Sequence, residues 1–103
     1  MVKAVCMFRL KKDVEEKAFE AFFKKHVEDA KKLERLKKYT IAKNIDADDK
    51  EGFYRVNELY YDSKEDADYS FSTKLAEEAT NDLLKWVDDC TVIMAEEETV
   101  ALT

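Results

Sequence analysis

The chain contains no proline, one glycine (Gly52), one histidine (His26) and two cysteines among its 103 residues. A single glycine excludes the glycine-rich loops that cradle phosphate groups. A single histidine excludes a metal site built from several histidines of one chain. The two cysteines, Cys6 and Cys90, lack the spacings of zinc and thioredoxin-type sites, so we expect two buried free thiols.

The sequence also lacks a long apolar run and an excess of positive charge. Residues 1–10 have neither the apolar segment nor the small-residue cleavage site of a secretion signal, so we expect a cytoplasmic protein. The net charge is -6, and the lysines are interleaved with acidic residues, which opposes binding to a phosphate backbone. We therefore expect neither a nucleic acid nor a membrane as a partner.

The residues that are present are sufficient for one folded domain. Hydrophobic residues make up 46% of the chain, which is enough for a core, and charged residues make up 41%, which implies a thoroughly solvated exterior. A second domain could not bury a core of its own at this length. We predict a single domain over residues 1–103 that folds without a disulfide or a structural metal.

The first third of the chain predicts a strand and a long amphipathic helix. Every second residue from position 2 to position 10 is apolar, which is the period of a β-strand, and Val5 and Met7 make the other face partly apolar as well. Asp13 and Glu16 have the spacing of a capping box and predict a helix over residues 13–33. The apolar face of this helix consists of Phe19, Phe22, Phe23, His26, Ala30 and Leu33.

The rest of the chain predicts three more strands and a second helical region. The strands are expected at residues 37–45, 53–61 and 90–95. The acidic segment 46–52 joins the first two of them and lacks the spacing of a calcium-binding EF-hand, so we interpret it as an exposed turn. Ser63 and Asp66 cap the second helical region, which residues 70–73 can interrupt. The residues after the last strand are either a loose tail or an arm that contacts a partner.

The order of these elements, βαββαβ, predicts an α+β fold of the ferredoxin-like type. In this fold a four-stranded antiparallel sheet carries both helices on one face. The other face would hold uncovered Val, Met, Tyr and Ile side chains, which a soluble monomer rarely exposes. We therefore expect a homodimer in which two sheets pack face to face. Arg9 and Glu58 are expected on this face, where they could form an ion pair.

Four stretches of the sequence carry a resemblance to a known family. They are the F-x-x-F-F-x-x-H pattern at residues 19–26, the Leu33, Leu36 and Tyr39 turn region, the ELYYDS run at residues 58–63, and the Asp82, Trp86 and Asp88 positions. With these motifs in this order, the chain resembles the EthD-like family of the dimeric α+β barrel superfamily over nearly its whole length. Two positions depart from the family pattern: Glu28 replaces a common Pro, and Arg35 replaces a common Gly.

The resemblance implies homodimers whose two sheets form a barrel. It also implies small apolar or aromatic ligands, and chemistry that often needs no cofactor, so we expect none. Relatives in the superfamily include lactone isomerases, polyketide cyclases and cofactor-free monooxygenases, while many EthD-like proteins have no established reaction.

His26 is the candidate catalytic residue, because an imidazole in an apolar cleft can act as a general acid or base near neutral pH. Tyr39, Asn57 and Tyr61 are the candidate ligand-binding residues. Alternation along residues 53–61 places Asn57 and Tyr61 on the face of Arg55 and Tyr54 on the opposite face.

Two interpretations of His26 remain open: a catalytic group in a pocket, or a structural histidine hydrogen-bonded to a strand. Two classes of function follow. The first is a small homodimeric enzyme, an isomerase, cyclase or cofactor-free oxygenase, that acts by acid/base chemistry on a small apolar or aromatic carbonyl compound. The second is a non-catalytic protein that binds such a molecule in the same pocket. Metal ligation is not predicted.

Overall fold

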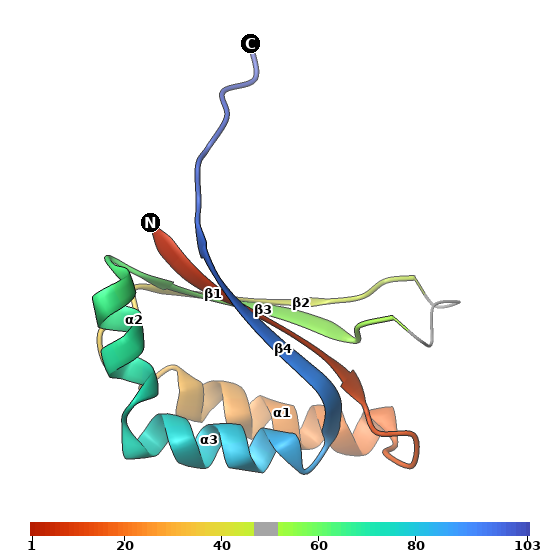
Figure 1. Ribbon diagram of the computed structural model, residues 1–103. Helices are drawn as coiled ribbons and strands as arrows, with labels where there is room; N and C mark the ends of the chain where they lie inside the picture. Colours follow the sequence, from red (N-terminus) through yellow and green to blue (C-terminus); the bar gives the residue numbers. More distant parts are fainter. Residues whose placement is uncertain (47–51) are drawn as a thin grey trace.

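The computed structural model describes residues 1–46 and 52–103, so most of the predicted connection 46–52 lies outside the described residues. The elements are β1 (Val2–Leu10), α1 (Glu16–Ala30), β2 (Lys38–Lys43), β3 (Arg55–Tyr61), α2 (Lys64–Phe71), α3 (Lys74–Leu84) and β4 (Val87–Glu96). The strands form one antiparallel sheet in the order β2-β3-β1-β4. The long helices α1 and α3 lie beneath the same face of the sheet (Figure 1). The predicted ferredoxin-like α+β fold is confirmed.

Helix α1 begins at Glu16, three residues after its predicted start at Asp13. The N-cap residue is Glu15, which makes no side-chain capping hydrogen bond, so the predicted capping box is wrong. Asp13 lies instead in a turn in which the amide of Val14 donates to the carbonyl of Lys11 at 3.0 Å. This turn brings Val14 against the aromatic core. Packing of the half-buried Val14 is worth about as much as a cap, on the order of 1 kcal/mol, and the residues that form this turn lie outside the helix.

The aromatic core forms between the first half of α1, β1 and the end of α3. Its buried members are Phe8, Phe19, Phe23, Leu83 and Val87. The Phe19 ring is 0% exposed and stacks on Phe23 with a centroid distance of 5.3 Å. It also meets Phe8 edge-on at 5.7 Å and Trp86 at 6.3 Å. The spacing of the phenylalanines in the sequence therefore identifies the half of α1 that packs on the sheet.

A polar clamp holds the outer side of α1 on β3. The carboxylate of Glu20 accepts hydrogen bonds from the Tyr54 hydroxyl at 2.7 Å and from Arg55 at 2.8 and 2.9 Å. The Arg55 guanidinium also lies over the Phe23 ring, 4.5 Å from its centroid. Tyr54 and Arg55 both contact α1, so the predicted placement of Tyr54 on the opposite face from Arg55 is wrong. The chain is irregular here because β3 begins only at Arg55.

The second helical region is divided as predicted. Ser63 caps α2 by accepting a hydrogen bond from the amide of Asp66 at 3.1 Å. Helix α2 ends at Phe71, and Thr73 then caps α3 by accepting from the amide of Ala76 at 3.3 Å. Two short helices replace one long helix because two side-chain hydroxyls compete with the helical hydrogen bonds. The Ser72 hydroxyl donates to the carbonyl of Tyr69, and the Thr73 hydroxyl donates to the carbonyl of Ser70.

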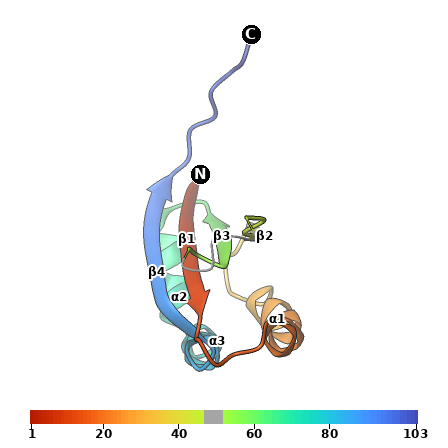
Figure 2. The ribbon, with the colours of Figure 1, turned by 90° about the vertical axis from the view of Figure 1, so that its right-hand side faces the viewer.

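The sheet face opposite the helices is open (Figures 1 and 2), and residues 98–103 run away from the body of the molecule. The strand register places five large apolar side chains on this face: Val5, Met7, Val56, Tyr60 and Ile93. At its centre Glu58 pairs with Lys3 at 2.9 Å, whereas Arg9 pairs with Asp89 at 3.0 Å. The expected ion pair between Arg9 and Glu58 is therefore wrong. Among the described residues no helix has the length and apolar character needed to span a membrane.

Arg35 adopts a left-handed backbone conformation, with φ of 67°. This is the position at which the EthD-like pattern has Gly, the residue that tolerates positive φ without a steric penalty. The Arg35 side chain compensates by pairing with Asp66 at 3.0 Å and by lying over the Tyr69 ring at 3.9 Å. Arg35 thus adopts a backbone conformation that glycine would adopt at a lower cost.

The left-handed backbone predicts a difference between two variants that both lose the guanidinium. We expect Arg35→Gly to be more stable than Arg35→Ala by about 1 kcal/mol, because only Gly relieves the clash between Cβ and the following carbonyl. Urea unfolding of the two variants measures this difference. Equal stability of the two variants would contradict a strained backbone at this residue.

Candidate functional site

A cavity of about 230 Å³ lies between α1, α3 and the sheet. It forms where the phenylalanine side chains of α1 end and small residues begin. Ala30 on α1 and Ala4 on β1 face Ala76 and Ala79 on α3, and none of these four fills the space between the layers. Because a cavity of roughly 150 Å³ is known to bind benzene, this one has room for a single substituted ring.

His26 lies at the edge of this cavity, one turn before Ala30 on α1. Its side chain is buried, and its ring packs on Phe22 and Phe23 with centroid distances of 5.6 and 5.8 Å. Within residues 1–46 and 52–103 no hydrogen bond is made by the imidazole, so the strand partner that a structural histidine would use is not seen there. Burial lowers the pKa of His26, opposed by the nearby charges of Asp29 and Asp82. The ring is therefore neutral at neutral pH and has a nitrogen lone pair available.

The lowered pKa of His26 predicts a pH dependence of stability. Below the ordinary value of 6.5 the unfolded chain binds a proton that the folded chain resists. The free energy of unfolding therefore falls as the pH drops from 6.5 toward the folded pKa, and it is constant above 6.5 as far as this group is concerned. The slope reaches at most about 1.4 kcal/mol per pH unit.

Urea unfolding of the wild type and of His26→Gln, between about pH 5 and pH 8, isolates this effect. The carboxylates are common to both proteins, so their contribution cancels in the difference between the two curves. We expect this difference to favour the wild type increasingly as the pH rises to 6.5 and then to level off. A difference independent of pH would show that His26 keeps an ordinary pKa.

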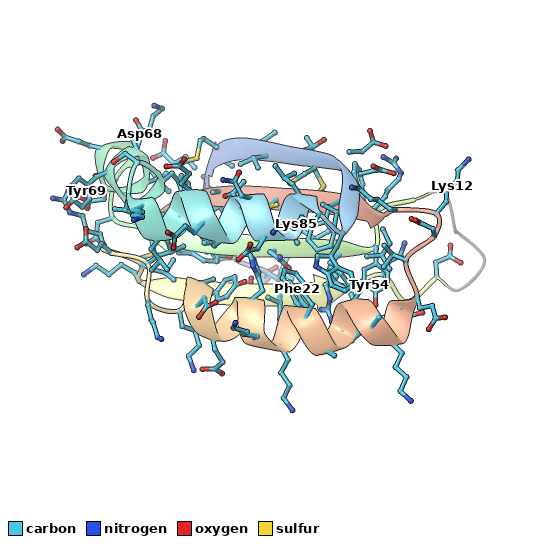
Figure 3. All side chains as sticks on the ribbon, turned by 90° about the horizontal axis from the view of Figure 1, so that it is seen from below. Lys12, Phe22, Tyr54, Asp68, Tyr69 and Lys85 are labelled. Carbon is cyan, nitrogen blue, oxygen red and sulfur yellow. The ribbon has the colours of Figure 1, made fainter. Side chains whose placement is uncertain are left out.

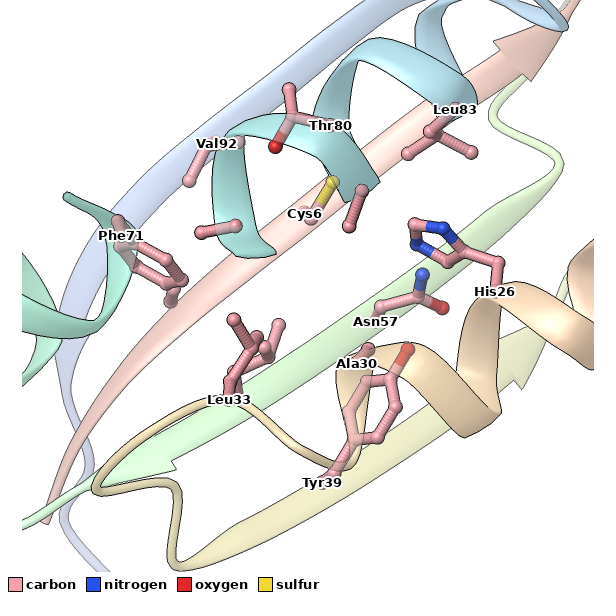
Figure 4. A pocket seen from close by; sticks show the side chains of 14 residues that line it. Cys6, His26, Ala30, Leu33, Tyr39, Asn57, Phe71, Thr80, Leu83 and Val92 are labelled. Atoms are coloured by element: carbon pink, nitrogen blue, oxygen red, sulfur yellow. The ribbon is translucent and has the colours of Figure 1, made fainter. Parts of the chain in front are cut away.

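Asn57 and Tyr39 enter the same cavity from the sheet. Asn57 on β3 is 3% exposed, and its Oδ1 atom has no hydrogen-bond partner among the described residues. Burial raises the pKa of Tyr39 on β2 to about 12, so its phenol stays protonated and can donate a hydrogen bond. In Figure 4 the Tyr39 hydroxyl and the Asn57 amide point toward the end of the cavity at which the His26 ring lies. The fold thus brings together three of the four residues singled out from the sequence.

Tyr61, the fourth candidate, does not line the cavity. It is 0% exposed, and its hydroxyl is 2.9 Å from the hydroxyl of Ser70 on α2. Its ring meets Phe71 edge-on at 5.6 Å. Since Phe71 does line the cavity, Tyr61 supports one wall from behind.

The sequence interpretation missed the contribution of α3 and of Cys6. Thr80 and Phe71 line the cavity, and so does Cys6, which pairs with Asn57 across β1 and β3. The signal in the sequence was a run of small residues at helical spacing, at positions 76, 79 and 80. Such a run shows that α3 approaches its neighbour closely, but it does not show whether the space is filled.

A second, polar cleft lies on the other side of His26, between α1 and α3. Figure 3 shows this side of the molecule, with Phe22 between the two helices and Lys85 nearby. Phe22 stacks on Trp86 at 5.1 Å and closes part of the gap. Asp29 and Asp82 line the cleft together with His26. The imidazole therefore separates an apolar inner cavity from a polar cleft that is open to solvent.

The described residues contain no cluster of three or more His, Cys, Asp or Glu side chains suited to a metal ion. The functional groups that line the cavity are thus one neutral imidazole (His26), one amide (Asn57), one phenol (Tyr39), one thiol (Cys6) and one hydroxyl (Thr80) on an apolar background. This set can remove or deliver a proton and can donate hydrogen bonds to a carbonyl oxygen.

No protein-family model matches the chain, and neither does any curated protein sequence. Solved structures do match. An EthD family protein from Bacillus halodurans is 23% identical with a TM-score of 0.81, and the match covers 95% of this chain and 99% of that one. A hydroxynitrile lyase from Passiflora edulis is 15% identical with a TM-score of 0.79, covering 97% and 96%. A dimeric protein of unknown function and ferredoxin-like fold from Bacteroides fragilis is 15% identical with a TM-score of 0.76, covering 93% and 95%.

At these identities the likeness concerns the fold. It extends along nearly the whole of each chain, from the first strand to the last. The resemblance to EthD-like proteins read from the sequence is thereby confirmed in three dimensions: the chain shares its ferredoxin-like α+β fold with an EthD family protein, a hydroxynitrile lyase and a dimeric protein of unknown function.

Proposed function

We propose that the protein is a small homodimeric enzyme in which His26 acts as a general base on a small apolar or aromatic carbonyl compound. One observation carries the proposal: a neutral imidazole without a hydrogen-bond partner among the described residues borders an apolar cavity, beside a buried amide with an unpartnered oxygen. Buried polar groups are normally paired, so an unpaired one in a cavity favours a ligand that completes it.

In the proposed reaction the ligand ring occupies the space between the alanines of α1 and α3. The neutral ring nitrogen of His26 takes a proton from the carbon next to the carbonyl group. The carbonyl oxygen, which gains negative charge, accepts a hydrogen bond from the Tyr39 hydroxyl or from the Asn57 amide nitrogen. In a cyclase the resulting enolate carbon attacks a second carbonyl group of the same molecule, and the oxygen of that group takes the proton from His26. In an isomerase the enolate takes this proton back at another carbon, which shifts the double bond.

The polar cleft behind His26 gives the proton a route to solvent. Asp29 and Asp82 border this cleft, and their charges favour the protonated imidazole that forms during the reaction. Burial outweighs these charges and leaves the resting imidazole neutral. One side of the His26 ring thus contacts the ligand, and the other side exchanges the proton with solvent.

The proposal is tested by the exchange of α-protons with solvent, which requires no knowledge of the natural substrate. Acetophenone, phenylacetone and γ-butyrolactone are incubated with the protein in D₂O, and the loss of the α-proton signal is followed by proton NMR. We expect exchange of at least one probe above the rate in buffer. Binding of a probe without any exchange would contradict catalysis and would assign a small-molecule binding protein instead.

A matched pair of variants shows whether the exchange takes place in the cavity. Ala79→Leu fills the space between the layers, whereas Ala21→Leu makes the same change at an exposed position of α1. We expect the first variant to lose both binding and exchange and the second to keep both. Equal effects of the two variants would exclude this cavity as the site.

We also propose that the homodimer forms through the open face of the sheet. The face carries apolar side chains around the Lys3–Glu58 pair, and Ile93 on it is 49% exposed. A large apolar patch of this kind is typical of an interface. The dimeric protein from Bacteroides fragilis supports the proposal, because it has the same fold.

Light scattering at micromolar concentration measures the assembly. We expect a mass twice that of the 12.1 kDa chain. Met7→Glu places a charge in the centre of the apolar face and is expected to weaken the dimer roughly 10-fold or more. Lys24→Glu, at an exposed position of α1, serves as the control and should have no effect. A monomeric wild type would contradict the proposal.

A further inference from the structure

Two thiols lie in contact beside the inner cavity and take no part in the proposed acid/base chemistry. Cys6 on β1 and Cys90 on β4 are free cysteines, and their Sγ atoms are 3.5 Å apart. Both are half-buried and pack against the aromatic core. A disulfide bond is about 2.0 Å long, so the sulfur atoms need to approach by only about 1.5 Å to form one.

The strand register explains why these two side chains meet. Cys6 is opposite Val92 on β4, so Cys90 lies two residues further along the strand and on the same face of the sheet. The pairing of β1 with β4 is irregular between Met7 and Arg9, and Asp89 next to Cys90 has a positive φ of 51°. Such an irregularity increases the local twist of two strands, and it allows side chains at diagonal positions to touch.

The two thiols are not equivalent. The hydrogen bond from Cys6 stabilises the thiolate of Cys90 and lowers the pKa of that thiol. The same hydrogen bond, together with burial, raises the pKa of Cys6. Cys90 lies on β4, an edge strand of the sheet, whereas Cys6 lies on the inner strand β1. A small reagent therefore has a more direct route to the sulfur atom of Cys90, which makes Cys90 the nucleophile of the pair.

We propose that Cys6 and Cys90 form a dithiol site that exchanges with small disulfides such as glutathione disulfide. The Cys90 thiolate attacks one sulfur of the small disulfide, the bond between its two sulfurs breaks, and one thiolate leaves. Cys6 then gives up its proton and attacks the Sγ atom of Cys90, which releases the second thiolate. In total the protein loses two protons and two electrons, one small disulfide is consumed, and two small thiols are released.

The position of the pair gives the reaction a structural consequence. Cys6 lines the inner cavity and is the direct cross-strand neighbour of Asn57. The disulfide would tie β1 to β4 and draw the Cys6 sulfur away from the cavity wall. The proposal itself does not depend on the acid/base function of that cavity.

The test uses the full-length protein in mixtures of glutathione and glutathione disulfide, followed by intact-mass measurement and thiol counting. We expect the wild type to lose two hydrogen atoms and both titratable thiols without retaining glutathione, and to recover both thiols on reduction. Cys6→Ser removes the second step, so this variant should accumulate a mixed disulfide of Cys90 with glutathione. Cys90→Ser removes the nucleophile and should react at least about 10-fold more slowly at neutral pH.

The possible outcomes separate the proposal from its alternatives. A wild type that retains glutathione, or that forms disulfide-linked dimers in place of the internal bond, would overturn it. So would equal reaction rates of the two single variants. Alkylation of the reduced wild type with iodoacetamide near pH 7 gives a check that needs no substitution. Cys90 should be modified before Cys6, and the reverse order would overturn the assignment of the nucleophile.

Discussion

Replacing His26 with Gln is expected to reduce the α-proton exchange of a bound carbonyl probe about 10²- to 10⁴-fold. Gln keeps a polar side chain of similar size on the wall of the cavity, but it cannot accept a proton at neutral pH. The ring it replaces is buried between Phe22 and Phe23 and is held neutral by burial. The substitution should lower the rate of exchange and change the affinity for the probe much less.

The control for this experiment is Lys24→Gln, which makes a substitution of the same kind on the exposed side of the same helix. Its exchange rate should equal that of the wild type. If His26→Gln retained the full rate, a base other than the single histidine would be responsible, and the proposed role of His26 would be refuted. If it lost binding as well as exchange, the imidazole would hold the ligand and not transfer a proton.

Replacing Phe19 with Ala is expected to cost about 3–5 kcal/mol of folding stability. The ring is 0% exposed and contacts aromatic rings from α1, β1 and the end of α3, so its removal leaves a cavity that the neighbouring side chains cannot fill. Domains of this size have a total stability of roughly 5–15 kcal/mol. This one substitution therefore removes a large part of the folding stability of the domain.

Urea unfolding, followed by the fluorescence of Trp86, measures the loss, because this is the only tryptophan and it contacts the Phe19 ring. The protein concentration has to be kept constant, since a dimer gains stability with concentration. Phe71→Ala is the matched control: Phe71 is 38% exposed, and its loss should cost less than half as much. A cost for Phe19→Ala below about 1.5 kcal/mol would show that the aromatic core is not the main support of α1.

Much of the fold could be predicted from the sequence because its periodic patterns report burial directly. The phenylalanine face of α1, the alternation of β1 and the capping residue Ser63 each have a local signature. The start of α1 could not be predicted from Asp13, because the turn that packs Val14 against the core depends on contacts in three dimensions. The prediction that Tyr54 lies on the opposite face from Arg55 was wrong for a similar reason, because the hydrogen bond from Tyr54 to Glu20 belongs to the tertiary structure.

The candidate site was predictable in part. His26, Tyr39 and Asn57 stand out as polar groups on faces that the pattern marks as buried, and the structure brings them to one cavity. The cavity itself has no sequence signature, because it depends on how Ala76 and Ala79 of α3 meet α1. The contact between Cys6 and Cys90 was equally hidden, since the residues lie 84 positions apart in the chain and the β1–β4 register joins them.

The central claim is that a small carbonyl compound binds beside the neutral imidazole of His26. It can be tested with one NMR titration, because the only histidine of the chain gives an unambiguous pair of imidazole proton signals. With acetophenone as the probe, we expect saturable shifts of these signals and of the Asn57 side-chain amide, with the imidazole remaining neutral at pH 7. Imidazole signals that do not move while the probe binds, or a ring that is already protonated at pH 7, would contradict the account.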